Sequence, residues 1–361
     1  MAAPSAPFQV ARHIIAKAIA SRVYPAAVVE VGTSDAVVWT EAFGAFTYDA
    51  GAPRATLETV FDLASLTKVV ATASVAMRLV ETGAVRLDAP VGTWVSGWNS
   101  EALRAITLRD LLGHCAGLPE WAPLSNTCAN RAEALTAISR CERAYAPRFT
   151  SRYSDLGFIV LGAALEAAGR APLDVSWERI AVQLRPASGP FDLMFRPPDQ
   201  WCDRIAPTRV DAGRGYPLVG EVDDDNAHLL GDVAGHAGLF GTAGALGRFA
   251  RAVMTSLQGE AGVLARPDTM RTFVTPTTIL GSSRALAWDT MRPTSSCGDR
   301  MSPAAFGHTG FTGTSLWIDP QRQLYVVLLT NRVHPHAGPA EPIQQVRRAV
   351  HDAVIDAWNV R

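Results

Sequence analysis

Ser65 and Lys68 stand three positions apart in the segment FDLASLTKVV (61–70), a spacing that suits nucleophilic catalysis. A serine hydroxyl becomes a strong nucleophile when a neighbouring base takes its proton, and a neutral lysine amine is such a base. The choice of lysine is informative, because the chain has 2 lysines against 31 arginines. Since arginine stays protonated in proteins, we infer that position 68 requires a residue that can lose its proton.

The segment 65–83 predicts a helix that is apolar on all sides and ends at Gly83. Such a helix belongs in a core, where burial and the positive end of the helix dipole favour the neutral form of Lys68. Ser65 and Lys68, at positions i and i+3, lie on one face of this helix. The alternative is that Ser65 only caps the helix and Lys68 reaches the surface, and the short motif S-x-x-K does not exclude it alone.

Three segments in order resemble motifs of the serine β-lactamase and penicillin-binding-protein superfamily, specifically its class C-like branch of esterases, D,D-peptidases and β-lactamases. FDLASLTKVVAT looks like the first motif, with Ser65 as the acylated nucleophile and Lys68 as its partner. YSDLGFIVLG (153–162) is similar to the second motif, Y-x-N. The resemblance makes Tyr153 the phenol of the proton relay and places Asp155 where asparagine is usual.

The third motif, K-T-G, resembles GHTGFTGTSLWIDP (307–320), with His308 in place of lysine before Thr309 and Gly310. The resemblance implies an acyl-enzyme mechanism in which water finally cleaves the acyl group from the serine. It also implies an oxyanion hole built from the backbone N–H groups of Ser65 and Phe311. A strand edge after Gly310 is expected to hold the substrate, since glycine allows close approach of its backbone.

Two departures from the family pattern bear on the chemistry. Asp155 adds a negative charge near Lys68 and Tyr153, which would favour a charged Lys68 and shift the proton relay. His308 removes a permanent cation that would hold a substrate carboxylate, which makes efficient β-lactam hydrolysis less expected. Histidine at this position is compatible with both the esterases and the D,D-peptidases of the family.

The pattern of elements predicts an α+β fold with one antiparallel sheet built from both ends of the chain. Strands are expected at 26–32, 36–44, 285–291, 313–320 and 323–331, and terminal helices at 8–22 and 341–358. We expect residues 1–87 and 232–361 to form the sheet domain and 88–231 an inserted, mostly helical domain, with the active site at their interface. The proline- and glycine-rich stretch 186–225 is interpreted as an extended loop.

Composition excludes several classes of function. A net charge of −1 without a basic run disfavours nucleic acid as a partner, and no apolar stretch has the length of a membrane span. The 5 cysteines are scattered and the N-terminus lacks a signal-peptide pattern, so we expect a cytoplasmic protein with reduced thiols and no cell-wall role. We expect no metal and no cofactor. DDDNAH (223–228) is interpreted as a solvated helix-capping loop. Trp121 either lines the acyl pocket or is a buried structural residue, and we expect the latter.

These observations favour a serine hydrolase, most of all a carboxylesterase acting on small acyl esters. One alternative is a D,D-peptidase, a D-amino-acid amidase or a weak β-lactamase, because the resemblance covers all of these activities. Another is a non-catalytic family member that binds small molecules, which the intact Ser65, Lys68 and Tyr153 disfavour. The expected partner is a small ester or amide substrate, and the sequence leaves the oligomeric state open.

Overall fold

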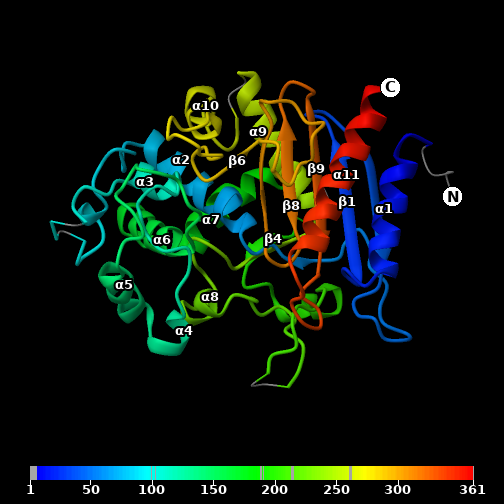
Figure 1. Ribbon diagram of the computed structural model, residues 1–361, viewed down its shortest axis with the longest axis horizontal. Helices are drawn as coiled ribbons and strands as arrows, with labels where there is room; N and C mark the ends of the chain where they lie inside the picture. The colour runs from blue at the N-terminus through cyan, green and yellow to red at the C-terminus, as the bar shows by residue number, and fades with distance from the viewer. Residues whose placement is uncertain are drawn as a thin grey trace.

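The computed structural model describes residues 6–98, 100–101, 103–187, 189, 191–212, 215–259 and 262–360. Residues 1–5, 260, 261 and 361 of the predicted sheet domain lie outside the described residues, as do 99 and 102 of the predicted helical domain and 188, 190, 213 and 214 of the predicted loop. Helices gather on one side of the molecule and a large sheet on the other (Figure 1).

The large sheet has six antiparallel strands in the order β2-β1-β9-β8-β7-β6. Its centre joins the two ends of the chain, because β1 pairs with β9 in a register that sets Ala27 opposite Thr330. This confirms the predicted α+β fold. The strands are β1 (Ala26–Gly32), β2 (Val37–Gly44), β6 (Asp289–Thr290), β7 (Phe306–Thr309), β8 (Ser315–Asp319) and β9 (Leu324–Thr330).

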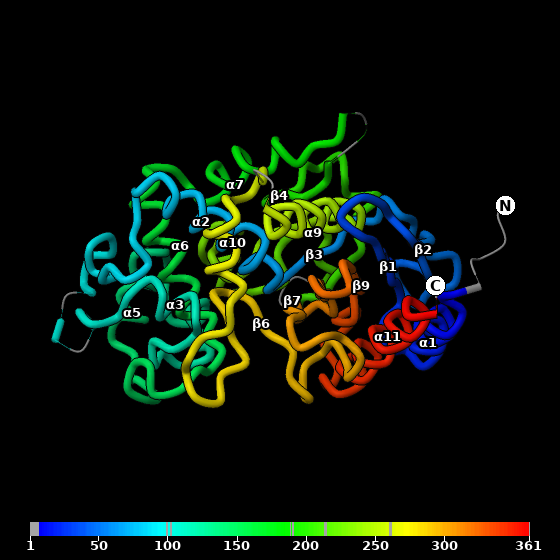
Figure 2. Tube along the Cα trace, turned by 90° about the horizontal axis from the view of Figure 1, so that it is seen from above, coloured from blue at the N-terminus to red at the C-terminus, as the bar shows by residue number. Residues whose placement is uncertain are grey.

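Both faces of this sheet are covered by helices. The terminal helices α1 (Gln9–Ala20) and α11 (Glu341–Asn359) lie on one face and α9 (Ala243–Gln258) on the other (Figures 1 and 2). Along β1, Val29 and Val31 belong to the apolar cluster under the terminal helices, whereas Val28 belongs to the cluster under α9. Because alternate residues of a strand face opposite ways, a strand buried on both faces is largely apolar, and Glu30 is the exception in β1.

Two predictions about strands are wrong. The strand expected at 285–291 is only two residues long, because Ala285 N–H donates to the Trp288 carbonyl and closes a turn. The loop expected at 186–225 contains β4 (Leu193–Phe195) and the 3₁₀-helix η5 (Asp199–Arg204). β4 pairs with β5 (Leu239–Gly241), which also pairs with β3 (Phe61–Asp62), to form a second sheet. These short strands depend on partners distant in the sequence, so local composition does not reveal them.

Of the remaining helices, α6 (Asp155–Gly169), α7 (Leu173–Ala181) and α10 (Pro267–Val274) pack against α2 (Ala73–Glu81). No single helix in the described ranges is long and apolar enough to cross a membrane. The segments Asp155–Gly169 and Leu173–Leu184 reach the required length and apolar composition only when taken together, and the chain bends by 74° between them. The α-helices are α2 (Ala73–Glu81), α3 (Leu108–Leu112), α4 (Leu124–Thr127), α5 (Arg131–Arg140), α6 (Asp155–Gly169), α7 (Leu173–Ala181), α8 (Asp225–Leu229) and α10 (Pro267–Val274). Short 3₁₀-helices are η1 (Ala6–Phe8), η3 (Val91–Thr93) and η4 (Val182–Leu184).

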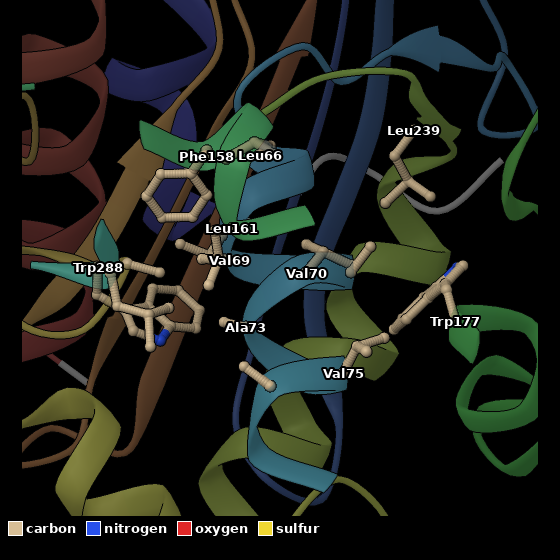
Figure 3. Close-up of a cluster of buried hydrophobic side chains, with 14 of the residues drawn as sticks. Leu66, Val69, Val70, Ala73, Val75, Phe158, Leu161, Trp177, Leu239 and Trp288 are labelled. Atoms are coloured by element: carbon tan, nitrogen blue, oxygen red, sulfur yellow. The ribbon is translucent and has the colours of Figure 1, made fainter. Parts of the chain in front are cut away.

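The helix that follows Ser65 runs through the core. Its side chains Val69 and Val70 pack among Phe158 and Leu161 of α6 and Leu239 of β5 (Figure 3). The helix predicted over 65–83 is continuous from Leu66 to Glu81 and contains a π-helical segment, η2 (Lys68–Thr72), directly before α2. π-turns are rare and are often found at functional sites. The predicted end is confirmed, because Gly83 adopts a left-handed φ of +75° after the last turn.

We expect Leu161→Ala to lower the free energy of unfolding by about 2–5 kcal/mol, because it leaves a cavity in this core. Leu161 is fully buried beside the helix that carries Lys68. Urea denaturation followed by circular dichroism measures the change. Val10→Ala is the control, since Val10 is 64% exposed and its truncation should change stability by less than about 0.5 kcal/mol. Equal effects of the two substitutions would contradict this packing.

Candidate active site

Ser65 is held by a short loop that follows β3. The carboxylate of Asp62 accepts hydrogen bonds from the backbone N–H groups of Ala64, at 2.8 Å, and Asp223, at 2.7 Å. Ala64 has a left-handed φ of +47°, so this side-chain support stabilises a backbone conformation that alanine seldom adopts. The loop therefore directs Ser65 out of the core and into a cavity.

Lys68 has no exposed surface and contacts three acceptors. Its Nζ lies 2.9 Å from Ser65 Oγ, 2.7 Å from Asp155 Oδ1 and 2.9 Å from the His236 carbonyl oxygen. The alternative that Lys68 reaches the surface is therefore wrong. Burial lowers the pKa of Lys68, and the adjacent Asp155 carboxylate opposes that shift.

Tyr153 closes a ring of hydrogen bonds. Its Oη lies 2.6 Å from Ser65 Oγ and 3.0 Å from Asp155 Oδ1. Burial, reinforced by Asp155, raises the pKa of Tyr153 well above its usual value, so the phenol keeps its proton. A carboxylate only accepts hydrogen bonds, so Tyr153 donates to Asp155 and Ser65 donates to Tyr153. Lys68 then donates to Ser65, to Asp155 and to the His236 carbonyl oxygen, and three donated hydrogens require an ammonium. The neutral amine that the sequence favoured is therefore replaced by a charged one in this ring.

His308 is buried at the end of β7 and is neutral. Its Nδ1 lies 2.8 Å from the Thr309 carbonyl oxygen, so Nδ1 carries the proton. Nε2 has no hydrogen-bond partner among the described residues and is free to accept one. Burial, with the nearby Arg284 and Lys68, lowers the pKa of His308 well below its usual value. His308 is therefore a neutral hydrogen-bond acceptor and not a cation.

The turn after β7 brings Gly310 and Phe311 beside the serine loop. The hydroxyls of Thr312 and Thr314 donate to the carbonyl oxygens of Asp62 and Leu63, at 2.7 and 3.0 Å. The substrate-binding strand expected after Gly310 is wrong, because β7 ends at Thr309 and these contacts pull the chain into a turn.

The two backbone N–H groups expected to form the oxyanion hole are available. Those of Ser65 and Phe311 donate no hydrogen bond within the described part of the chain. Gly310 is packed so closely on the serine loop that a Cβ added there would lie 2.5 Å from the Leu63 carbonyl oxygen. Two N–H groups from adjacent, mutually fixed loops are the usual construction of an oxyanion hole.

All these groups meet around one cavity of about 800 Å³. Lys68 does not line it and lies behind Ser65, in the core. The structure thus brings together the eight residues that the sequence selected. The seven that line the cavity are Ser65, Tyr153, Asp155, His308, Thr309, Gly310 and Phe311.

Arg284 is a site residue that the sequence did not reveal. Its guanidinium carbon lies 5.4 Å above the centre of the Tyr153 ring, and the side chain lines the cavity. Its guanidinium forms no hydrogen bond or ion pair with the residues that the structure describes. One arginine among 31 carries no signal in the sequence. Trp121, expected to be buried, is instead 52% exposed at the same cavity.

The acidic run 223–228 lies against the active site. Asp224 caps α8, as expected, and its carboxylate also lies 2.9 Å from His236 Nε2. Asp223 is buried, so the expectation of a solvated loop is wrong there. Burial, together with Asp223, raises the pKa of Asp62 to about 7. The described side chains include no cluster of three or more His, Cys, Asp or Glu residues placed to hold a metal ion.

The fold and the site define the class as a serine hydrolase. The model of the Beta-lactamase family matches residues 11–351, and the chain belongs to that family. A putative D-alanyl-D-alanine carboxypeptidase of Escherichia coli K12 is 28% identical to it over 88% of this chain and 80% of that protein.

Solved structures share the fold. EstCE1, described as a hydrolase with promiscuous acyltransferase activity, superposes with a TM-score of 0.75 at 21% identity, over 97% of this chain and 98% of that one. Simvastatin synthase (LovD) from Aspergillus terreus gives a TM-score of 0.73 at 19% identity, over 97% and 98%. At this level of identity both likenesses concern the fold alone.

We expect Gly310→Ala to slow phosphonylation of Ser65 by about 10²-fold, because the added Cβ displaces the turn that carries the Phe311 N–H. Intact-mass spectrometry after timed exposure to a fluorophosphonate measures the rate. Gly338→Ala is the matched control, since a Cβ there meets nothing within 4 Å. Equal rates in the two variants would show that the position of this turn does not matter for acylation.

Proposed function

We propose that this protein removes the carboxy-terminal residue from short peptides ending in D-alanyl-D-alanine, through an acyl-enzyme on Ser65. The observation that carries the proposal is Arg284, a cation at the cavity without a protein partner. The names of the curated relatives support the same reaction. The substrate is a short peptide and not the cell-wall polymer, so the proposal is independent of the expected cytoplasmic location.

A carboxypeptidase must hold a free carboxylate one residue beyond the bond that it cleaves. A guanidinium with free N–H groups binds a carboxylate in a fixed, two-pronged geometry. Two further arginines that line the cavity, Arg332 and Arg347, are buried and form no ion pair with described residues. Arg347 donates to the carbonyl oxygens of Gly310 and Thr314. Carboxylates also line this cavity, so the argument for an anionic leaving group depends on Arg284, whose guanidinium has no partner among the described residues.

The ring of hydrogen bonds provides the proton transfers. Ser65 Oγ forms a bond to the carbonyl carbon while its proton passes to Tyr153, whose own proton passes to Asp155. When the carbon–nitrogen bond breaks, the leaving amine takes a proton from Tyr153, which recovers one from Asp155. Water then attacks the acyl carbon while its proton passes to Tyr153, whose own proton passes to Asp155. The bond from that carbon to Ser65 Oγ breaks, Ser65 takes a proton from Tyr153, and the acyl group leaves as an acid. Lys68 remains an ammonium throughout and stabilises the negative charge that develops on Ser65.

We expect Asp155→Asn to lower kcat by about 10²-fold, because the amide cannot take the Tyr153 proton. The substitution also removes the charge that opposes burial at Lys68, so the pKa of Lys68 falls further. Since the ammonium is the active form, activity is lost as pH rises through that pKa, and the basic limb of the kcat/KM profile moves to lower pH.

Asp224→Asn is the control for this pH profile, because Asp224 acts on Lys68 more weakly than Asp155 does. It should move the basic limb less. If Lys68 instead acts as a neutral base, activity is gained as pH rises through its pKa. Asp155→Asn would then extend activity toward acid pH, and that outcome would rule out the charged ring.

Hydrolysis of small acyl esters is the second candidate, and the sequence favoured it. Part of the cavity wall is uncharged, because His308 is neutral and the rings of Trp121 and Phe311 are exposed there. This part of the wall suits an uncharged substrate. The solved structure of EstCE1, a hydrolase with acyltransferase activity, shares the fold. An ester without a carboxylate would make no use of Arg284, which is why we rank the peptide first.

A panel of three substrates separates these candidates: an acylated peptide ending in D-alanyl-D-alanine, p-nitrophenyl acetate and a chromogenic cephalosporin. We expect wild type to cleave the peptide and Ser65→Ala to cleave none of the three. Arg284→Gln should raise the peptide KM at least about tenfold, since a charged partner is lost, and change p-nitrophenyl acetate hydrolysis by less than threefold.

Arg284→Lys should restore part of the peptide affinity, and Arg104→Gln, at an exposed position outside the cavity, should change neither substrate. Equal losses on peptide and ester in Arg284→Gln would refute the carboxylate role. A wild type that turns over only the ester would establish the second candidate.

A further inference from the structure

Asp62 is a buried carboxylate at which three parts of the active site meet. It is 2% exposed, and its two oxygens accept from different parts of the chain. Oδ1 accepts from the Ala64 N–H at 2.8 Å, and Oδ2 accepts from the Asp223 N–H at 2.7 Å. The backbone carbonyl of Asp62 accepts from the Thr312 hydroxyl at 2.7 Å. Asp62 therefore joins the serine loop to the acidic run and to the turn that carries the Phe311 N–H.

No cation is bonded to the Asp62 side chain in the described ranges. The charged groups that face it are carboxylates, Asp223 before Asp224. Arg209 and Arg332 act on Asp223 instead, and Arg209 Nη1 lies 3.5 Å from Asp223 Oδ2. Strand β5, which pairs with β3, contributes only uncharged residues beside Asp62. The negative charge of Asp62 is thus stabilised by two backbone N–H groups and opposed by its neighbours.

The two hydrogen bonds of Asp62 require an ionised carboxylate. A carboxylate accepts on both oxygens, whereas a protonated carboxyl group has one O–H, which donates. Because each oxygen faces a backbone N–H, a proton on either of them sets a donor against a donor and breaks one bond. Loss of the first bond releases Ala64, which holds a left-handed φ of +47° directly before Ser65. Loss of the second detaches the serine loop from the acidic run.

We propose that Asp62 is a positioning residue whose ionised carboxylate holds Ser65 in the conformation that reacts, and that Asp223 adjusts the pH at which this support is lost. The proposal rests on the function proposed above only through the nucleophile Ser65, and not through the substrate. The test therefore uses a fluorophosphonate, which reports the reactivity of Ser65 without a peptide or an ester.

Activity and stability respond to the ionisation of Asp62 in opposite directions. Burial, and after it the charge of Asp223, raise the pKa of Asp62 to about 7. Since the ionised form positions Ser65, phosphonylation is lost as pH falls through that pKa. Because the pKa is higher in the folded than in the unfolded chain, the contribution of Asp62 to the free energy of unfolding is present at low pH and is lost as pH rises through the folded pKa. General acid unfolding would lower both quantities together.

The first experiment measures the rate of phosphonylation by intact-mass spectrometry between about pH 5 and 9. Below the pKa of Asp62 the wild-type rate should fall about tenfold per pH unit, as for a single ionisation. Asp223→Asn removes a charge that raises this pKa, so the acid limb should move to lower pH. At about pH 6 its rate, relative to its own plateau, should be at least about threefold that of wild type.

Asp352→Asn is the matched control for this profile. The Asp352 carboxylate also accepts from two backbone N–H groups, those of Asp299 and Arg300, but it does not line the active-site cavity. Its removal should leave the acid limb where it is in wild type.

Asp62→Asn imitates the protonated side chain, since an amide has one acceptor oxygen and one donor group. At about pH 8 we expect phosphonylation at least about tenfold slower than in wild type, and less than about threefold change down to pH 6. Urea denaturation at the same two pH values gives a second readout. The stability of the variant relative to wild type should improve as pH rises, because the variant lacks the buried charge. A merely structural role would produce the same stability difference at both values.

An acid limb at the same pH in wild type and Asp223→Asn would overturn the proposal. The limb would then belong to another group such as Asp155, which is bonded to Lys68 and Tyr153 and not to Asp223. A folded Asp62→Asn protein that reacts at the wild-type rate would overturn it equally. If Asp62→Asn does not fold, the profile of Asp223→Asn decides. A wild type that is not phosphonylated at Ser65 would refute the nucleophile, and with it both the function proposed above and the positioning role.

Discussion

The Lys68 ammonium has no exposed surface, and an isolated charge in such a position would be strongly destabilising. Three oxygen atoms compensate it, and they come from three separate parts of the chain: Ser65, Asp155 and the His236 carbonyl. Helix η2, the start of α6 and the loop before β5 must therefore be placed together. Thr72 reinforces this arrangement, since its hydroxyl donates to the Gly235 carbonyl oxygen at 2.7 Å.

A second constraint links the sheet to this centre. The turn after β7 is tied to the serine loop through Thr312 and Thr314, and Arg347 of α11 holds its outer side. The terminal helix thus has a role beyond covering the sheet. It fixes the loop that offers the Phe311 N–H, so the geometry of acylation depends on an element far away in the sequence.

The distribution of charge around Tyr153 shows how specificity and fold are connected. His308 is neutral because it is buried beside two cations, and Arg284, one of those cations, lines the cavity above the Tyr153 ring.

The sequence by itself determined the α+β sheet from both chain ends, the helix of Lys68 and the order of the three motifs, because periodicity and short spacings are local properties. Its resemblance to the three family motifs also selected eight of the residues that meet at the site. Only the tertiary structure decided the charged state favoured at Lys68, the neutrality of His308 and the presence of Arg284. Each depends on burial and on partners tens to hundreds of positions away, such as Asp155, which no local pattern encodes.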